Sequence, residues 1–265
     1  MSVSYPTKSD PGEPVLFHAR ADGIAIITIN RPERGNALDA EVRYALTHAW
    51  RHFEADPALH IAILTGAGDK AFCTGADVEE MVATAMRVPP RDFAPVPYDN
   101  IELTKPTIAA VNGAAFADGW LIAQACDLCV ASTTACFAIP GVKLGRGSPW
   151  AAPLIHMIPQ RIMMELILTG QPITAQRAYE IGLVNRLADP ADLIDTAVAL
   201  AQDVLEGAPL SVKAGRETVM LATEMGRAAA LAAGRAAHEH ACCSQDAQEG
   251  PRAFAEKRKP VWRGE

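Results

Sequence analysis

The sequence predicts an α/β fold, because strand-like runs alternate with helix-like segments. Residues 23–29 and 61–65 are short, apolar and rich in β-branched side chains. Residues 39–55, which lie between them, carry apolar side chains at nearly helical spacing. The same order recurs further along the chain. Alternation of this kind indicates a core in which helices pack on strands.

Each element in turn has a recognisable beginning or end. Residues 1–13 are polar and rich in Pro and Gly, so we expect a flexible lead-in and a fold that starts near Val15. Asp39 is a suitable N-cap for the first long helix, and Asp56 before Pro57 is a suitable stop. The second strand–helix–strand unit covers residues 107–111, 118–125 and 127–131.

Two later regions differ from this alternating core. Residues 81–100 contain four prolines and no regular periodicity, which predicts a loop or broken helix over the core and a candidate lid. Beyond this, we expect the core to cover residues 14–189 and a helical oligomerisation region to cover residues 190–265. The expected C-terminal helices are residues 193–205, 211–223, 228–241 and 246–257.

The composition favours a globular, cytoplasmic protein. Of 265 residues, 49% are hydrophobic, but the longest apolar runs are far too short to span a membrane. The N-terminus has no basic and apolar leader, and the net charge of −7 argues against a nucleic-acid partner. Adjacent Cys242 and Cys243 cannot easily bridge each other, so we expect reduced thiols. The seven histidines show no metal-ligand spacing, so we expect no metal.

Four segments, in order, carry a resemblance to a known family. They are residues 30–38 (NRPERGNAL), 71–77 (AFCTGAD), 105–113 (KPTIAAVNG) and 169–178 (TGQPITAQRA), the last continued by GLV at 182–184. Each is weak alone, but together they resemble the crotonase (enoyl-CoA hydratase/isomerase) superfamily. The resemblance implies a spiral of strand–strand–helix repeats, a C-terminal helical trimerisation region and an acyl-CoA thioester as substrate. It also implies a homotrimer or dimer of trimers, with no cofactor beyond the CoA moiety.

The resemblance further implies an oxyanion hole formed by the backbone N–H groups of Ala76 and Asp118. Two such donors stabilise the charge that develops on a thioester oxygen, and losing one costs about 3 kcal/mol. The family usually has Gly where this sequence has Asp118. Because Asp is a favoured N-cap, we expect Asp118 to cap the following helix. The alternative is that its carboxyl group acts as an acid or base.

The two glutamates that hydratases of this family use for proton transfer are replaced here. The motif match puts them at Leu121 and Gly141, and neither side chain can exchange a proton. An aspartate that dienoyl isomerases and dehalogenases of the family place further on corresponds to Pro149. The resemblance therefore implies an enzyme with atypical acid–base groups.

Other polar residues nearby are weaker candidates, because each has a simpler interpretation. They are Cys73, Tyr98, Asp99, Lys143, Arg146, Ser148 and His156. We expect Ser148 to cap a helix and His156 to be buried in an apolar helix. The two cations are expected to be solvated, Cys73 to be a small buried residue, and Asp127 to be structural.

The resemblance implies that CoA is contacted both by residues of the first two motifs and by residues near the C-terminus. The expected residues are Arg31, Thr74, Gly75, Ala76, Lys257 and Arg258. Arg and Lys suit phosphates through charge and hydrogen bonds. The alternative for residues 257–259 is a solvated tail. Glu79 stands near where some relatives have a CoA-contacting lysine, which weakens that contact here.

Three hypotheses about function remain open at this point. The first is an enoyl-CoA hydratase/isomerase-like enzyme with atypical proton-transfer groups. The second is a hydrolase that cleaves a carbon–carbon bond in a cyclic β-keto acyl-CoA or β-diketone, with Asp118 as acid or base. The third is a catalytically weak acyl-CoA binding protein.

Overall fold

The computed structural model describes residues 12–265, so most of the lead-in expected over residues 1–13 lies outside the described residues. Its main sheet has six strands in the order β1-β2-β3-β5-β7-β10. They are β1 Val15–Ala19, β2 Ile24–Ile29, β3 Ile61–Gly66, β5 Thr107–Val111, β7 Leu128–Ser132 and β10 Arg186–Ala188. Within this sheet β1 pairs antiparallel with β2, and the other neighbours are parallel.

A second, smaller sheet lies beside the first. It consists of β4 Ala71–Cys73, β6 Ala114–Phe116, β8 Cys136–Ala138 and β9 Ile173–Thr174, in that spatial order. In the chain, each of β3, β5 and β7 is followed by the strand that enters the second sheet. This repeated passage from one sheet to the other forms the expected spiral, and the predicted α/β class is confirmed.

Helices and short 3-10 segments complete the core. The helices are α1 Ala40–Ala55, α2 Val78–Ala83, α3 Asp118–Ala125, α4 Gln160–Thr169, α5 Ala175–Glu180 and α6 Leu193–Leu205. The 3-10 segments are η1 Pro32–Arg34, η2 Pro140–Leu144, η3 Pro149–His156 and η4 Pro190–Asp192. Helix α1 begins as predicted, because the Asp39 carboxylate accepts a 2.9 Å hydrogen bond from Val42 N.

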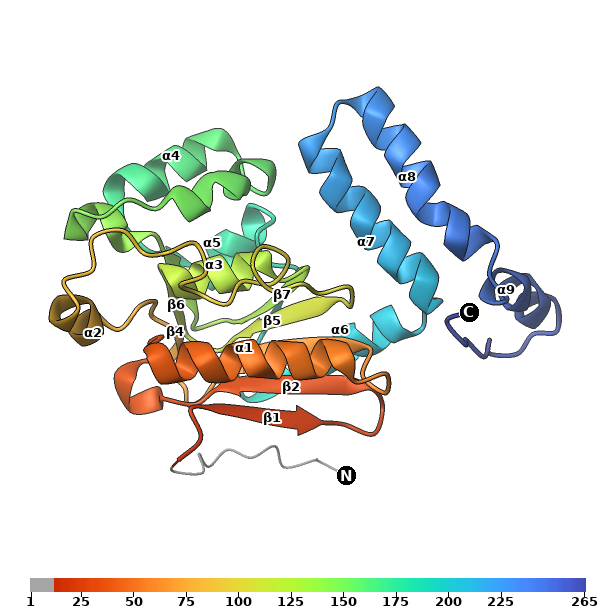
Figure 1. The fold of residues 1–265 in the computed structure, drawn as a ribbon, viewed down its shortest axis with the longest axis horizontal. Helices are drawn as coiled ribbons and strands as arrows, with labels where there is room; N and C mark the ends of the chain where they lie inside the picture. The colour runs from red at the N-terminus through yellow and green to blue at the C-terminus, as the bar shows by residue number, and fades with distance from the viewer. Residues whose placement is uncertain (1–11) are drawn as a thin grey trace.

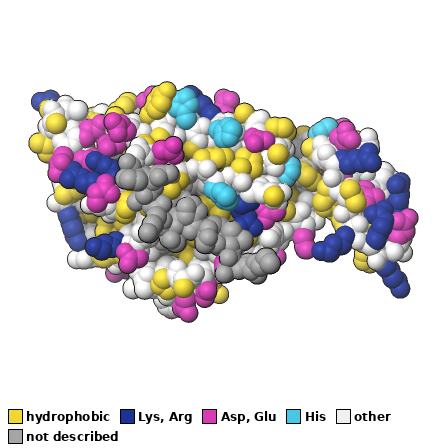
Figure 2. All heavy atoms as spheres, turned by 90° about the horizontal axis from the view of Figure 1, so that it is seen from below, with side chains coloured by type: hydrophobic (Ala, Val, Ile, Leu, Met, Phe, Trp, Pro, Cys, Tyr) yellow, Lys and Arg dark blue, Asp and Glu magenta, His cyan; other side chains and the backbone are white. Residues whose placement is uncertain are grey.

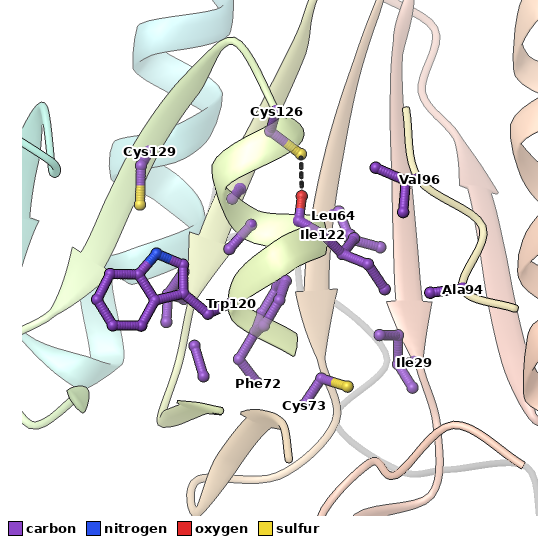
Figure 3. Close-up of a cluster of buried hydrophobic side chains, with 14 of the residues drawn as sticks. Ile29, Leu64, Phe72, Cys73, Ala94, Val96, Trp120, Ile122, Cys126 and Cys129 are labelled. Atoms are coloured by element: carbon purple, nitrogen blue, oxygen red, sulfur yellow. Dashed lines mark hydrogen bonds between the residues drawn. The ribbon is translucent and has the colours of Figure 1, made fainter. Parts of the chain in front are cut away.

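The largest hydrophobic cluster lies between the strands, α1 and α3 (Figure 3). Strands β3 and β5 are buried along their whole length, which explains why they appear in the sequence as continuous apolar runs. Helix α6 covers the other face of the main sheet, where Leu193 and Ala197 join Ile63 and Val130 in a second cluster. Residues 193–205 therefore pack back onto the core.

The last three helices project from the sheets. They are α7 Pro209–Glu224, α8 Arg227–Cys242 and α9 Asp246–Ala255. Helices α7 and α8 form a hairpin beside the core, and α9 lies past the open end of this hairpin, on the side away from the sheets (Figure 1). The predicted helical segments agree with these bounds to within a few residues. Among residues 12–265, no helix is both long and apolar enough to cross a bilayer.

One carboxylate connects this hairpin to the core. Asp127 accepts hydrogen bonds from the Tyr98 hydroxyl (2.6 Å), Thr107 N (2.9 Å) and Arg216 Nε (2.6 Å). The Arg216 guanidinium also lies 3.3 Å from the centre of the Tyr98 ring. The structural role expected for Asp127 is confirmed, because it joins the segment after α2, strand β5 and helix α7.

Candidate active site

The first side of the candidate site is built where residues 30–38 meet residues 71–77. Leu38 N donates to Gly75 O (2.8 Å), and Asp77 N donates back to Leu38 O (3.3 Å). The Asn36 side-chain amide donates to Ala71 O over 2.7 Å. Because backbone groups of both motifs are paired in this way, the position of Ala76 between Gly75 and Asp77 is fixed by its neighbours.

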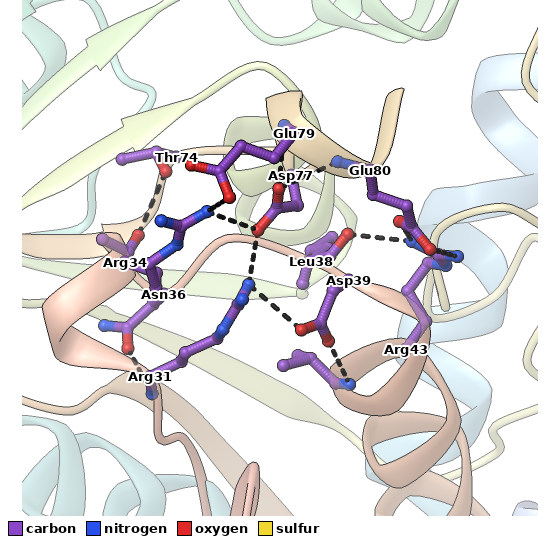
Figure 4. A network of polar contacts seen from close by, with 12 residues as sticks. Arg31, Arg34, Asn36, Leu38, Asp39, Arg43, Thr74, Asp77, Glu79 and Glu80 are labelled. Atoms are coloured by element: carbon purple, nitrogen blue, oxygen red, sulfur yellow. Dashed lines mark hydrogen bonds and ion pairs between the residues drawn. The ribbon is translucent and has the colours of Figure 1, made fainter. Parts of the chain in front are cut away.

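A network of ion pairs surrounds this side (Figure 4). The Asp77 carboxylate caps α2 by accepting from Glu79 N (2.9 Å) and Glu80 N (3.2 Å). Its other oxygen lies 2.6 Å from Arg31, whose guanidinium holds the pKa of Asp77 below its usual value. Arg31 also pairs with Asp39 at 3.1 Å.

The positive charges near Ala76 are therefore already compensated. Arg34 pairs with Glu79, and Arg43 pairs with Glu80 at 2.6 Å. Arg43 also stacks over Phe93, 4.2 Å from the ring centre. Arg31, expected as a CoA contact, is therefore already paired with two carboxylates, those of Asp39 and Asp77. Thr74, the neighbouring expected contact, uses its hydroxyl to donate to Gly35 O (3.2 Å).

The second side of the site is the start of α3, which is held by close contacts. A Cβ on Gly119 would lie 1.9 Å from the Cys73 carbonyl oxygen, so only glycine fits there. Ala117 has φ 49° and ψ −121°, a region that side chains with a Cβ rarely adopt. Ala117 N also donates to Ala138 O over 3.2 Å, which fixes the turn into the helix.

The two sides meet through a hydrogen bond from Ala76 N to Asp118 Oδ2, 3.2 Å long. The expected capping role of Asp118 is wrong, because no side chain caps α3 and the carboxyl group turns toward Ala76 instead. Burial raises the pKa of Asp118, and the hydrogen bond from Ala76 opposes that rise only in part. An ionisable group thus lies directly against one expected oxyanion donor.

Cys73, the last residue of β4, belongs to the buried hydrophobic cluster in which Figure 3 draws its side chain. Burial raises the pKa of its thiol to about 12, so the thiol is neutral at physiological pH. Its sulfur accepts a 3.5 Å hydrogen bond from Gly75 N. The expectation of a small buried residue is confirmed.

The positions of the replaced glutamates contain no acid. Leu121 packs, partly buried, against the main hydrophobic cluster. Gly141 is buried in η2, where a Cβ would lie 2.6 Å from Ser148 Oγ and 3.0 Å from Arg146 O. A longer side chain at position 141 would require Ser148 and Arg146 to move.

Several simpler interpretations of nearby residues need correction. Ser148 precedes η3 but its side chain makes no capping hydrogen bond. His156 is exposed rather than buried. Arg146 is not a free cation, because it donates to Met86 O (2.8 Å) and Arg87 O (3.0 Å) and so joins the segment after η2 to the segment after α2. Lys143 is exposed, as expected.

The expected C-terminal CoA contacts lie at the opposite end of this chain from Ala76. Lys257 and Arg258 follow α9, whereas α2 lies at the other end of the long axis (Figure 1). Arg258 pairs with Glu249 (2.5 Å) and Glu256 (2.6 Å). Figure 2 shows Lys and Arg side chains at both ends of this axis. One chain alone does not bring the two basic regions together.

The paired sheets, the spiral connection and the meeting of Ala76 with Asp118 define a crotonase-type α/β protein. The solved structure of an enoyl-CoA hydratase from Mycobacterium tuberculosis H37Rv is similar, with a TM-score of 0.87 and 39% identity over 96% of this chain and 100% of that one. A family model described as enoyl-CoA hydratase/isomerase matches residues 19–265. The chain belongs to the enoyl-CoA hydratase/isomerase family.

Curated relatives agree with this assignment. An (E)-benzylidenesuccinyl-CoA hydratase of Thauera aromatica is 37% identical over 250 residues, 91% of this chain and 96% of the relative. A carnitinyl-CoA dehydratase of Salmonella paratyphi A is 38% identical over 259 residues, 94% and 98% of the two chains. The fold and family expected from the sequence motifs are therefore confirmed.

Proposed function

We propose that this protein carries out a hydratase- or isomerase-type reaction on an acyl-CoA thioester, with Asp118 as its proton-transferring group. The hydrogen bond of 3.2 Å between Ala76 N and Asp118 Oδ2 carries the proposal. It brings together two segments that lie far apart in the sequence, and it indicates that the Ala76 N–H is accessible to an acceptor oxygen. A thioester oxygen is such an acceptor.

The backbone N–H groups of Ala76 and Asp118 would polarise the thioester carbonyl. In an enoyl thioester, this withdraws electrons from the double bond, so that water can add at the β-carbon while negative charge gathers on the carbonyl oxygen. Fixed donors in a site that excludes water stabilise that charge, by about 3 kcal/mol for each donor. The positive end of α3 adds to the effect.

The α-carbon must then gain a proton and the adding water must lose one, and neither transfer can use the usual glutamates, because positions 121 and 141 are Leu and Gly. Protonated Asp118 would give its proton to the α-carbon, and the carboxylate left behind would take the proton that the water releases. Asp118 is the ionisable group in contact with the expected donor. Its raised pKa keeps a larger fraction of the side chain protonated than an exposed aspartate would be. The names of the two relatives, a hydratase and a dehydratase of CoA thioesters, support a reaction of this type.

Turnover assays with mass spectrometry test the proposal. The purified protein is incubated with crotonyl-CoA and, in parallel, with cyclic β-keto acyl-CoAs. We expect addition of water to the enoyl thioester, and we expect Asp118→Asn to lower kcat by about 10²- to 10⁴-fold. Asp69→Asn is the matched control, because Asp69 is an exposed carboxylate on the loop between β3 and β4.

The other outcomes distinguish the remaining hypotheses. Cleavage of the cyclic substrates alone, lost in Asp118→Asn, would favour carbon–carbon hydrolysis. Binding of acyl-CoA without turnover would favour a binding protein. Unchanged turnover in Asp118→Asn would remove Asp118 from the chemistry.

We also propose that α7–α9 form the oligomer interface of a homotrimer or dimer of trimers. Exposed apolar side chains on these helices support this, including Val219, Leu231 and Phe254, which is 87% exposed in the single chain. Lys257 and Arg258 would then act on CoA only if the assembly brings them to the site of another copy. Light scattering of the purified protein, in which a monomer would contradict the proposal, provides the test.

A further inference from the structure

The Asp118 side chain occupies the place that a substrate oxygen needs. Its Oδ2 atom accepts the Ala76 N–H at 3.2 Å, and that N–H is one of the two donors proposed for the thioester carbonyl. A hydrogen-bond donor of fixed direction serves one well-placed acceptor at a time. The carboxylate and a thioester oxygen therefore compete for the same group.

The surroundings of Asp118 give its carboxylate little compensation. Within residues 12–265, its hydrogen bond from Ala76 has no accompanying ion pair. Arg43 of α1 attracts the carboxylate electrostatically. Arg43 is, however, already paired with Glu80 of α2 and hydrogen-bonded to Leu38 O (2.9 Å). The Cys73 thiol of β4 is the other titratable group that Asp118 faces, and that thiol is neutral. The charge of ionised Asp118 is therefore stabilised mainly by the hydrogen bond from Ala76 N–H.

We infer that the Asp118 carboxylate is an internal ligand of the oxyanion hole, which closes the hole to thioester oxygens until the side chain is neutral and swings away. This inference rests on the proposed function, because it assumes that the thioester carbonyl binds at Ala76. It concerns ligand binding, however, and not turnover.

Two physical effects make protonation the opening step. A carboxylate accepts a charge-assisted hydrogen bond that is roughly twice as strong as a neutral one, so protonation weakens its hold on Ala76. Protonation also removes the repulsion between the carboxylate and the negative charge that develops on the thioester oxygen. The displaced side chain then lies beside the carbonyl and carries a proton, as the proposed function requires.

Binding of two ligands that differ only in the acyl group tests this inference. Butyryl-CoA has the thioester carbonyl but no double bond to hydrate, and CoA itself has no carbonyl. Isothermal titration calorimetry gives the Kd of each between pH 5 and pH 8.5. Titration of the phosphates, and of residues that contact only the nucleotide, changes both Kd values by the same factor. The ratio of the CoA Kd to the butyryl-CoA Kd therefore reports only pH effects at the acyl group.

We expect this ratio to fall at least tenfold from pH 5 to pH 8.5 in the wild-type protein, because ionised Asp118 excludes the carbonyl. Asp118→Asn, which keeps the shape without the charge, should show a ratio that does not change with pH. Asp118→Gly should bind butyryl-CoA at least tenfold more tightly than the wild type at pH 8.5. Circular dichroism checks that both variants are folded, and Asp69→Asn should follow the wild type.

A ratio independent of pH in the wild type would overturn the inference, as would an unchanged pH trend in Asp118→Asn. Weaker binding of butyryl-CoA by Asp118→Gly than by the wild type would also contradict it. If the ratio responds to pH as expected but no substrate turns over, the inference stands and the proposed reaction fails. If butyryl-CoA binds no better than CoA in any variant at any pH, the carbonyl does not bind at Ala76 and both fail.

Discussion

The two sides of the candidate oxyanion hole are held in place by different forces. Ala76 is positioned by polar contacts, with Asp77 capping α2 and pairing with Arg31 at 2.6 Å. Asp118 is positioned by close packing, with Gly119 against the Cys73 carbonyl and a strained backbone at Ala117. Stability that comes from polar contacts changes with pH and with the charge of a side chain. Stability that comes from close packing changes with the volume of a side chain. Substitutions on the two sides should therefore have different signatures.

The largest effect is expected from Gly119→Ala on the packed side. The new Cβ would lie 1.9 Å from the Cys73 carbonyl oxygen, so strand β4 or helix α3 must move. We expect the free energy of unfolding to fall by about 3 kcal/mol in urea titrations. Gly215→Ala in α7 is the control, because a Cβ at this position would have no atom within 4 Å. This substitution should leave the free energy of unfolding unchanged or raise it. Equal effects of the two substitutions would show that packing does not support this side.

A smaller loss is expected on the polar side, from Asp77→Ala. It removes the cap of α2 and a partner of Arg31, and we expect a loss of about 2 kcal/mol at pH 7. The folded pKa of Asp77 is lowered, so its contribution is complete above the unfolded pKa of about 4 and is lost as pH falls further. The difference between variant and wild type should therefore shrink below pH 4. A difference independent of pH from 7 to 3 would contradict this interpretation.

Ala117→Gly should stabilise the protein, in contrast to both changes above. Glycine adopts the observed φ of 49° without strain, and this outweighs the greater freedom of glycine in the unfolded chain. We expect a gain of about 1 kcal/mol in urea titrations. Ala115→Gly in the neighbouring strand β6, where no strain is relieved, should instead lose about 1 kcal/mol.

The smallest effect is expected from Asp118→Asn on stability. Because burial raises the folded pKa of Asp118, its ionised form destabilises the fold as pH rises above the unfolded pKa of about 4. The variant should therefore melt about 1–2 °C higher than the wild type at pH 8, with no difference at pH 4. A scanning calorimetry result of the opposite sign would show that the folded protein favours the carboxylate.

The sequence predicts the fold of this protein better than it predicts the site. Helix α1 could be located from apolar spacing and from Asp39, because both are local features. The C-terminal helices were predicted for the same reason. The passage between two sheets came from the family resemblance, since β4, β6 and β8 have only three residues each and leave little periodicity to detect.

The contact between Ala76 and Asp118 could not be predicted in detail. A local rule favours Asp as a helix cap, and it failed because an unpaired N–H from a distant segment competes for the carboxylate. Arg43 was missed because its partners Glu80 and Phe93 are distant in sequence. The sequence offered one indication of Arg43, namely a basic residue one helical turn after the N-cap Asp39.

The contacts of Asp127 also have a consequence for synthesis of the chain. Its carboxylate receives Tyr98 and Thr107 from preceding segments, but Arg216 lies 89 residues further on. On a ribosome, every strand of the two sheets is synthesised before α7, so during that interval Asp127 lacks its guanidinium partner. The nascent core therefore reaches its final state only when the beginning of the last helical hairpin has left the exit tunnel.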